Sequence, residues 1–69
     1  MSPSIRSVVI QRAQGRDIQL DPEAGARFRS EWEFRSEFGD NRPIEVLDVD
    51  GVQREVRPRE VTVVKNCYS

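Results

Sequence analysis

Residues 26–38 read ARFRSEWEFRSEF, and this stretch decides the fold. Every odd position in it is charged, and every even position is apolar or serine. This is the period-two pattern of a β-strand with one solvated and one buried face. On a helix, the same residues give only a narrow apolar stripe, with Phe34 and Phe38 to one side of it. The alternation therefore favours an extended strand whose aromatic side chains point to the interior.

A helix beginning at Pro22 is the alternative interpretation of the same region. Asp21-Pro22-Glu23 is a good start for a helix, because Asp is a favourable N-cap and Pro is favourable in the first turn. No Val, Ile or Thr occurs between residues 21 and 43. Glu and Arg also recur at i,i+4 spacing from Glu23 to Arg35, although this ladder follows from the alternation itself. The helix would cover residues 22–36 and lie between two hairpins in an α+β fold.

Short β-strands account for most of the remaining chain, because apolar, β-branched segments alternate with turn sequences. They are expected at residues 5–13, 17–20, 44–49, 52–56 and 61–64. Asp50-Gly51 is a strong hairpin signal. A two-residue loop there would place Val46 opposite Glu55, whereas a loop one residue longer would place Val46 opposite Val56. We favour the second register, because it pairs apolar with apolar side chains across the strands.

Val56, Pro58 and Val61 resemble the end of small SH3-like barrels, in which a strand, a one-turn 3₁₀ helix and a last strand follow one another. The resemblance covers about fifteen residues and implies a fold only, since the acidic loop and paired tryptophans of peptide-binding SH3 domains are missing. The favoured fold is therefore all-β. It is a five- to six-stranded meander that forms an SH3-like barrel or a two-layer sheet.

The length of 69 residues allows one domain with a small core. We expect a flexible N-terminus at 1–4, a single β domain at 5–64 and a frayed tail at 65–69. A core of this size supplies only about 3–5 kcal/mol, and the single Cys67 excludes an internal disulfide. The core is expected to contain Phe28, Trp32, Phe34, Val46, Val56, Val61 and Val63. Its small size suggests a homo-oligomer or a subunit of a larger, phage- or virion-like complex.

The residue types argue against catalysis. The chain has no His, so the commonest general base is missing, and no imidazole can activate Cys67. Asp48-Val49-Asp50-Gly51 looks like part of an EF-hand loop, but Val46 and Arg57 would then occupy ligand positions that require oxygen donors. We expect a protein that is not an enzyme and that has no cofactor or metal.

Partner binding is the remaining class of function. Arg54, Arg57 and Arg59 form a small basic cluster that could contact phosphate or an acidic partner. The alternative is a nucleic-acid-binding β barrel, which the net charge of −1 disfavours. No stretch has the length and apolarity of a membrane span, and no signal peptide precedes the domain, which favours the cytoplasm. The leading hypothesis is a non-catalytic interaction or assembly module that binds itself or a larger protein.

Overall fold

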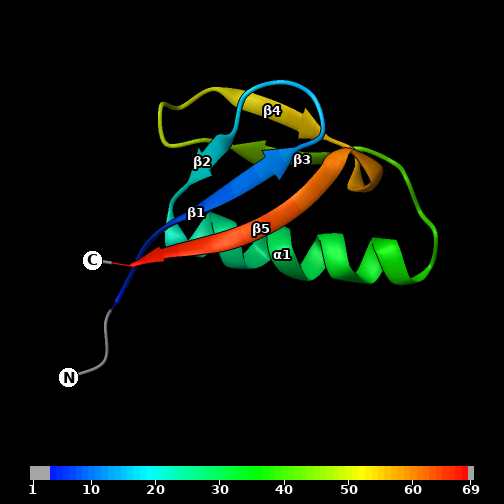
Figure 1. Ribbon diagram of the computed structural model, residues 1–69, viewed down its shortest axis with the longest axis horizontal. Helices are drawn as coiled ribbons and strands as arrows, with labels where there is room; N and C mark the ends of the chain where they lie inside the picture. The colour runs from blue at the N-terminus through cyan, green and yellow to red at the C-terminus, as the bar shows by residue number, and fades with distance from the viewer. Residues whose placement is uncertain (1–3, 69) are drawn as a thin grey trace.

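A computed structural model describes residues 4–68 of the chain. It is an α+β fold with one long helix and two small open sheets (Figure 1). The elements in chain order are β1 (Ile5–Arg12), β2 (Ile18–Leu20), α1 (Pro22–Glu37), β3 (Ile44–Leu47), β4 (Gln53–Val56), the one-turn 3₁₀ helix η1 (Pro58–Glu60) and β5 (Val61–Tyr68). Of the expected N-terminal segment, only Ser4 lies within the described residues.

The favoured all-β fold is wrong, because the stretch that decides the fold is helical. Helix α1 begins where the alternative interpretation placed it. The carboxylate of Asp21 accepts the N–H of Ala24 at 2.8 Å, and Pro22 occupies the first turn. Local capping and the absence of β-branched residues therefore outweigh the period-two pattern of residues 26–38.

The C-terminal end of α1 is also fixed by its local sequence. Gly39 has a φ of +68°, which places it in the left-handed region that favours glycine. Its N–H donates to Ser36 O at 3.3 Å, and the N–H of Asp40 donates to Arg35 O at 2.8 Å. These two hydrogen bonds form a Schellman motif, which provides donors for two of the last carbonyl oxygens of the helix. Gly39 is therefore the residue that ends the helix.

The larger sheet has the order β2-β1-β5, and both of its pairings are antiparallel. Val9 pairs with Gln19 in the β1–β2 hairpin, which is formed by the strands expected at residues 5–13 and 17–20. On the other side of β1, Val9 pairs with Lys65 of β5, and the pairing continues to Ile5 and Tyr68. Residues 65–68, which the sequence assigned to a tail, therefore belong to β5.

The smaller sheet is the β3–β4 hairpin, and its register differs from both expected registers. Val46 lies opposite Arg54, not opposite Glu55 or Val56. The reason lies in the turn, where the Asp48 carboxylate accepts the N–H groups of Asp50 and Val52, both at 2.9 Å. Asp48 thereby becomes the first residue of a turn, which the N–H of Gly51 closes by donating to Asp48 O at 3.0 Å. Gly51, at a φ of +79°, completes a three-residue loop.

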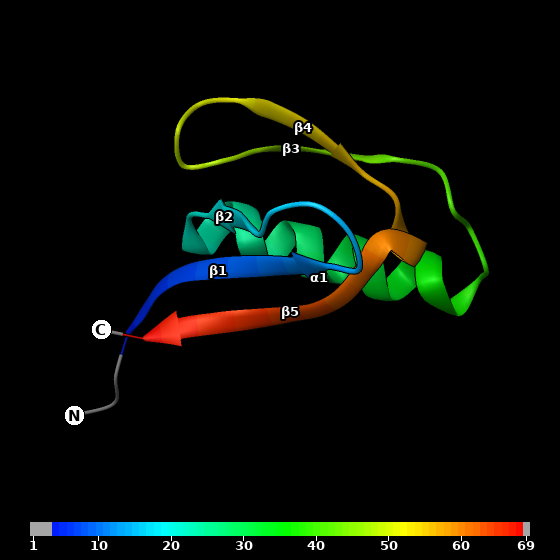
Figure 2. The same ribbon diagram turned by 45° about the horizontal axis from the view of Figure 1, so that its top comes forward.

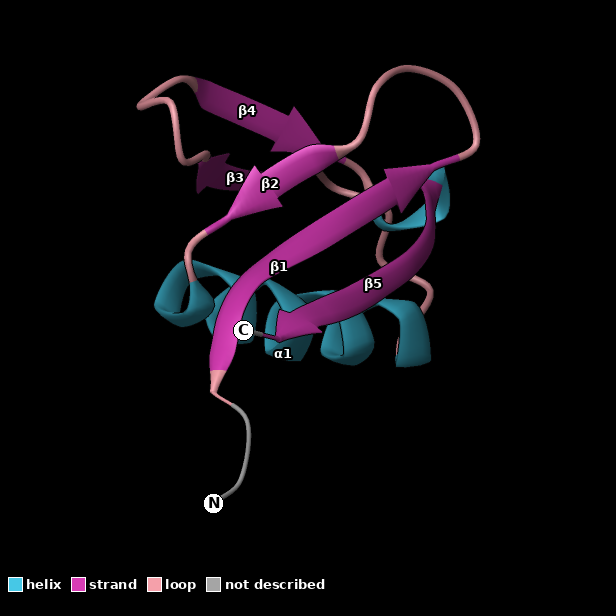
Figure 3. Cartoon of the chain, turned by 60° about the vertical axis from the view of Figure 1, so that its left-hand side comes forward, coloured by secondary structure: helices cyan, strands magenta, loops and turns pink. Residues whose placement is uncertain are grey.

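Helix α1 packs against both sheets. It runs along the lower side of the view in Figure 1, and Figure 2 shows the β3–β4 hairpin above it. The side view in Figure 3 shows the β3–β4 hairpin behind β2, apart from the β1–β5 pair. Among the described residues, one backbone bond joins the hairpin to the larger sheet: the N–H of Val49, in the loop after β3, donates to Gln19 O of β2 at 3.0 Å. The core lies between these three layers and consists of Val8, Ile10, Ile18, Leu20, Ala24, Phe28, Ile44, Val46 and Val56.

Five of the seven expected core residues lie in or against this core. Phe28, Val46 and Val56 are buried, and Trp32 and Val61 are partly buried and pack against them. The other two expectations are wrong, since the exposed fractions of Phe34 and Val63 are 61% and 39%. Phe34 is exposed because a helix rotates about 100° per residue, so that residues 28 and 34 point in different directions.

The SH3-like resemblance predicts the order of the last elements correctly, but the barrel that it implies is not formed. Strand β4 ends at Val56, η1 begins at Pro58 and β5 begins at Val61, in the order that the resemblance implies. However, residues 4–68 form two open sheets, both in contact with α1, and no closed barrel. No helix in this part of the chain is long and apolar enough to cross a membrane.

Candidate functional site

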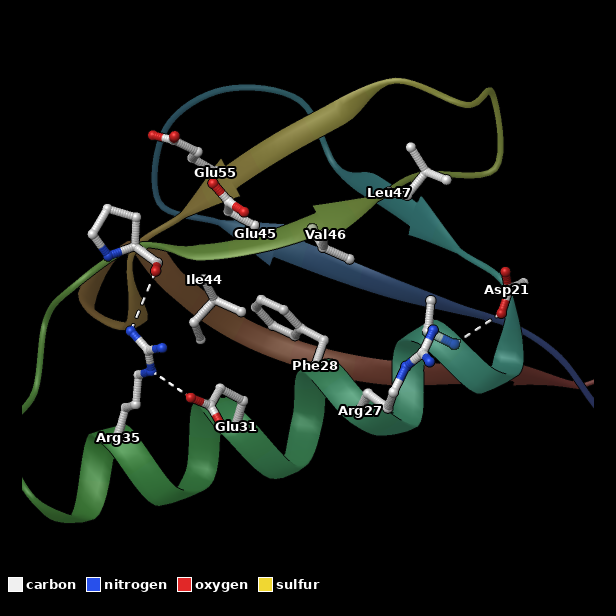
Figure 4. Close-up of a pocket in the computed structure, with 12 residues that line it drawn as sticks. Asp21, Arg27, Phe28, Glu31, Arg35, Ile44, Glu45, Val46, Leu47 and Glu55 are labelled. Carbon is white, nitrogen blue, oxygen red and sulfur yellow. Dashed lines mark hydrogen bonds and ion pairs between the residues drawn. The ribbon is translucent and has the colours of Figure 1, made fainter.

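A groove of about 790 Å³ runs between α1 and β3 (Figure 4). Its floor is apolar and its rim is charged. The floor is formed by Ala24, Phe28, Ile44 and Val46, and the rim by Arg27, Glu31, Arg35, Glu45 and Glu55, with Leu47 exposed beside them. An apolar floor with a charged rim is typical of surfaces that bind another molecule.

The helix side of the groove is held in place by Arg35. Its Nε donates to Glu31 Oε1 at 2.7 Å, one turn earlier in α1. Its Nη1 donates to the carbonyl oxygens of Arg42 and Pro43, at 2.8 and 3.2 Å. Arg35 thus ties α1 to the start of β3 and closes one end of the groove, as the close-up in Figure 4 shows.

The strand side of the groove is an unpaired sheet edge. Among the described strands, β3 pairs only with β4. The N–H of Asp48 donates to Val52 O at 3.0 Å, which identifies this pair as hydrogen-bonded. Because hydrogen-bonded and non-hydrogen-bonded pairs alternate along an antiparallel ladder, Val46 also bonds to β4, whereas the backbone groups of Glu45 and Leu47 point to the free edge.

The outer face of the hairpin carries two carboxylates directly opposite each other. Glu45 pairs with Glu55 in the register of β3 and β4, and both side chains are exposed. In a non-hydrogen-bonded pair the two side chains lie close together, and like charges in this position repel each other. No salt bridge of the described residues involves either one. The rim beside the free edge is therefore locally acidic.

The three arginines expected to contact a partner do not share one function in the structure. Arg54 is bound internally, because its Nε donates to Asp48 Oδ2 at 2.9 Å. Arg57 donates through Nη1 to Asn41 O at 3.0 Å. Arg59 contacts the same Asn41 through its backbone N–H, and its side chain is exposed. Two of the three guanidinium groups thus stabilise turns and loops of the chain itself.

A smaller hollow of about 310 Å³ lies where the turn after β3 meets the β1–β2 hairpin. Its charged groups bind within the chain, as in the Arg54–Asp48 pair and in the donation from Arg12 to Arg16 O at 2.6 Å. The backbone N–H of Val52, followed by Arg54, lowers the pKa of Asp48 below its ordinary value of 3.8. These internal contacts explain the turn, and they leave the larger groove as the better binding site.

Metal-binding clusters and thiols are two further kinds of chemical site. No three His, Cys, Asp or Glu side chains in residues 4–68 gather where they could hold a metal ion. Cys67 is a free thiol in β5, away from the groove. The chain matches no protein-family profile, no curated protein and no solved structure.

Sequence reasoning missed the groove because the groove depends on the helix. In the strand interpretation, the solvated face contained Arg27, Glu31 and Arg35, and no other element was expected to pack beside it. In the structure these residues follow α1 at i,i+4 spacing, on the side that faces β3. The cap sequence at Asp21 was the signal that could have identified this arrangement.

Proposed function

We propose that this protein is a non-catalytic interaction module that binds an extended segment of another protein by strand addition at β3. The observation that carries the proposal is the position of the β3 edge. The free backbone groups of Glu45 and Leu47 belong to residues that line the groove, so a bound strand could form its ladder and place alternate side chains on the apolar floor.

The dimensions of the site suit a single extended segment. Strand β3 has four residues, and two of them offer free donors and acceptors. Side chains that point inward from an added strand would contact Phe28 and Ala24 of α1, which are both buried in the free protein. Leu47, with an exposed fraction of 55%, offers an apolar contact on the outer face.

The test is a selection of random linear peptides of about ten residues against the full chain, followed by affinity measurements on matched variants. Leu47→Pro removes an N–H from the free edge of β3, whereas Gln53→Pro removes one from the outer edge of β4. Leu47→Ala controls for the loss of the side chain. Circular dichroism checks that each variant is folded.

We expect the selected peptides to lose at least about tenfold in affinity for Leu47→Pro and to keep their affinity for Gln53→Pro. Failure to select any peptide would overturn the proposal, as would an equal loss of affinity in the two proline variants. A homodimer that Leu47→Pro dissociates would show that the occupant is a second copy of the chain. Nucleic-acid binding and a cytoplasmic location stay predictions from the sequence.

A further inference from the structure

The Glu45–Glu55 pair lies on the same hairpin as the free edge of β3. The two carboxylates are direct cross-strand neighbours on the outer face, and both line the groove rim. Neither takes part in a salt bridge of the described residues, although the chain has eleven Lys and Arg. This repulsion is unfavourable in the free protein, and a cation placed beside Glu45 would relieve it.

We infer that the segment bound at β3 carries an Arg or Lys directly opposite Glu45, next to two apolar residues. The inference rests on the proposed strand addition. A residue opposite Glu45 in an added strand points to the outer face, where both carboxylates lie. The next residue lies opposite Val46 and points to the floor beside Phe28, and the one after it lies opposite Leu47. The partner sequence therefore reads basic-apolar-apolar in one direction of the chain or the other.

Charge complementarity also distinguishes this partner from a second copy of the chain. Two β3 edges paired around a two-fold axis at Val46 would place Glu45 opposite Leu47 of the other copy. No basic residue would then lie beside the carboxylates, and the two Glu45–Glu55 pairs would be diagonal neighbours on one face. Strand addition between two copies would thus increase the repulsion, whereas a basic segment removes it.

The experiment measures the affinity of the best selected peptide for two double variants by fluorescence polarisation. Glu45→Gln with Glu55→Gln neutralises the outer face of the hairpin. Glu33→Gln with Glu37→Gln changes the net charge equally on the exposed side of α1 and serves as the matched control. A peptide in which Gln replaces the basic residue completes a double-mutant cycle with the hairpin variant.

We expect the selected peptides to share a basic-apolar-apolar pattern. The hairpin variant should bind the best of them at least about tenfold more weakly, with little effect from the control variant. The peptide with Gln should bind the native protein as weakly, and its affinity should not fall further with the hairpin variant. Equal binding by the two double variants would overturn the inference. If Leu47→Pro still abolished that binding, strand addition would stand without the basic residue, and if it did not, both proposals would fail.

Discussion

A Cβ atom added to Gly25 of α1 would lie 2.3 Å from Cγ2 of Val8 in β1. Gly25 is buried, so the absence of a side chain allows the helix to approach the larger sheet closely. This contact sets the position of the N-terminal half of α1, which contributes Ala24 and Phe28 to the groove floor.

Substitution of Gly25 by Ala is expected to destabilise the protein by about 1–3 kcal/mol, although Ala has the higher helix propensity. The added methyl group must displace Val8 or shift the helix. Urea unfolding measures the effect, and Ser30→Ala on the exposed side of α1 is the control. A Gly25→Ala variant as stable as the native protein would show that the close approach has no energetic consequence.

Phe28 and Phe34 should respond oppositely to truncation, which separates the observed helix from the expected strand. Phe28→Ala removes a buried ring and should cost about 3–5 kcal/mol. Phe34→Ala removes an exposed ring whose neighbour is Phe38, at a centroid distance of 4.9 Å, and should cost less than about 1 kcal/mol. Similar losses in the two variants would agree with the strand interpretation and contradict the helix.

Much of the fold follows from local signals in the sequence, but in the middle of the chain two local signals disagree: the cap at Asp21 favours a helix, and the alternation in residues 26–38 favours a strand. The β1–β2 hairpin and the order of β4, η1 and β5 follow from β-branched segments and turn residues. The alternation in residues 26–38 wrongly predicted a strand. A helix accommodates the same alternation when some of its aromatic rings, such as those of Phe34 and Phe38, are exposed to solvent. Tertiary contacts add to the local cap signal at Asp21: Gly25 packs against Val8, and Arg35 bonds to the carbonyls before β3.

The site was less predictable than the fold, because the groove forms between α1 and β3, which are separate segments of the sequence. Exposed backbone groups on a strand edge depend on register, and the register depends on a side chain in the turn. Asp48 binds two amide hydrogens there, which moves the pairing of Val46 to Arg54. The Asp-Gly sequence indicated a turn, and the favoured loop of three residues has the observed length, but it was placed one residue too far along the chain.

Asp48 should make the stability of the protein sensitive to acid. Its pKa is lower in the folded state, so its contribution is complete above the ordinary pKa of 3.8 and is lost as the pH falls through the folded value. Asp48→Asn should therefore be less stable than the native protein at pH 6, and the difference should shrink steadily below pH of about 4. Urea unfolding as a function of pH measures this, with Asp50→Asn as the control. A difference that does not change with pH would contradict the role of the carboxylate.

Arg29 should protect the end of β5 from opening. Its Nη2 donates from α1 to Val64 O at 3.2 Å and to Asn66 Oδ1 at 2.7 Å. Arg29→Ala should therefore speed amide exchange in residues 64–68 by about tenfold, because the outer edge of β5 loses its contact with the helix. Arg27→Ala is the control, because Arg27 forms only an exposed ion pair within α1, with its Nη1 3.8 Å from Oε1 of Glu23. Equal exchange in both variants would argue against this role.

Glu45→Gln should have opposite effects on stability and on binding. It removes the repulsion with Glu55 and should stabilise the free protein by up to about 1 kcal/mol. The same change should weaken the binding of a basic peptide, because the attraction to the carboxylate is lost. Thermal unfolding and fluorescence polarisation measure the two effects. A variant that loses both stability and affinity would indicate a structural role for Glu45 instead.

Amide exchange of Glu45 and Leu47, followed by NMR with and without a selected peptide, tests strand addition at β3 most directly. We predict that both amides exchange at least about tenfold more slowly in the complex, while the amide of Gln53 on the outer edge of β4 is unchanged. Unchanged exchange at Glu45 and Leu47 in a saturated complex, or protection confined to Gln53 or β5, would contradict strand addition at β3.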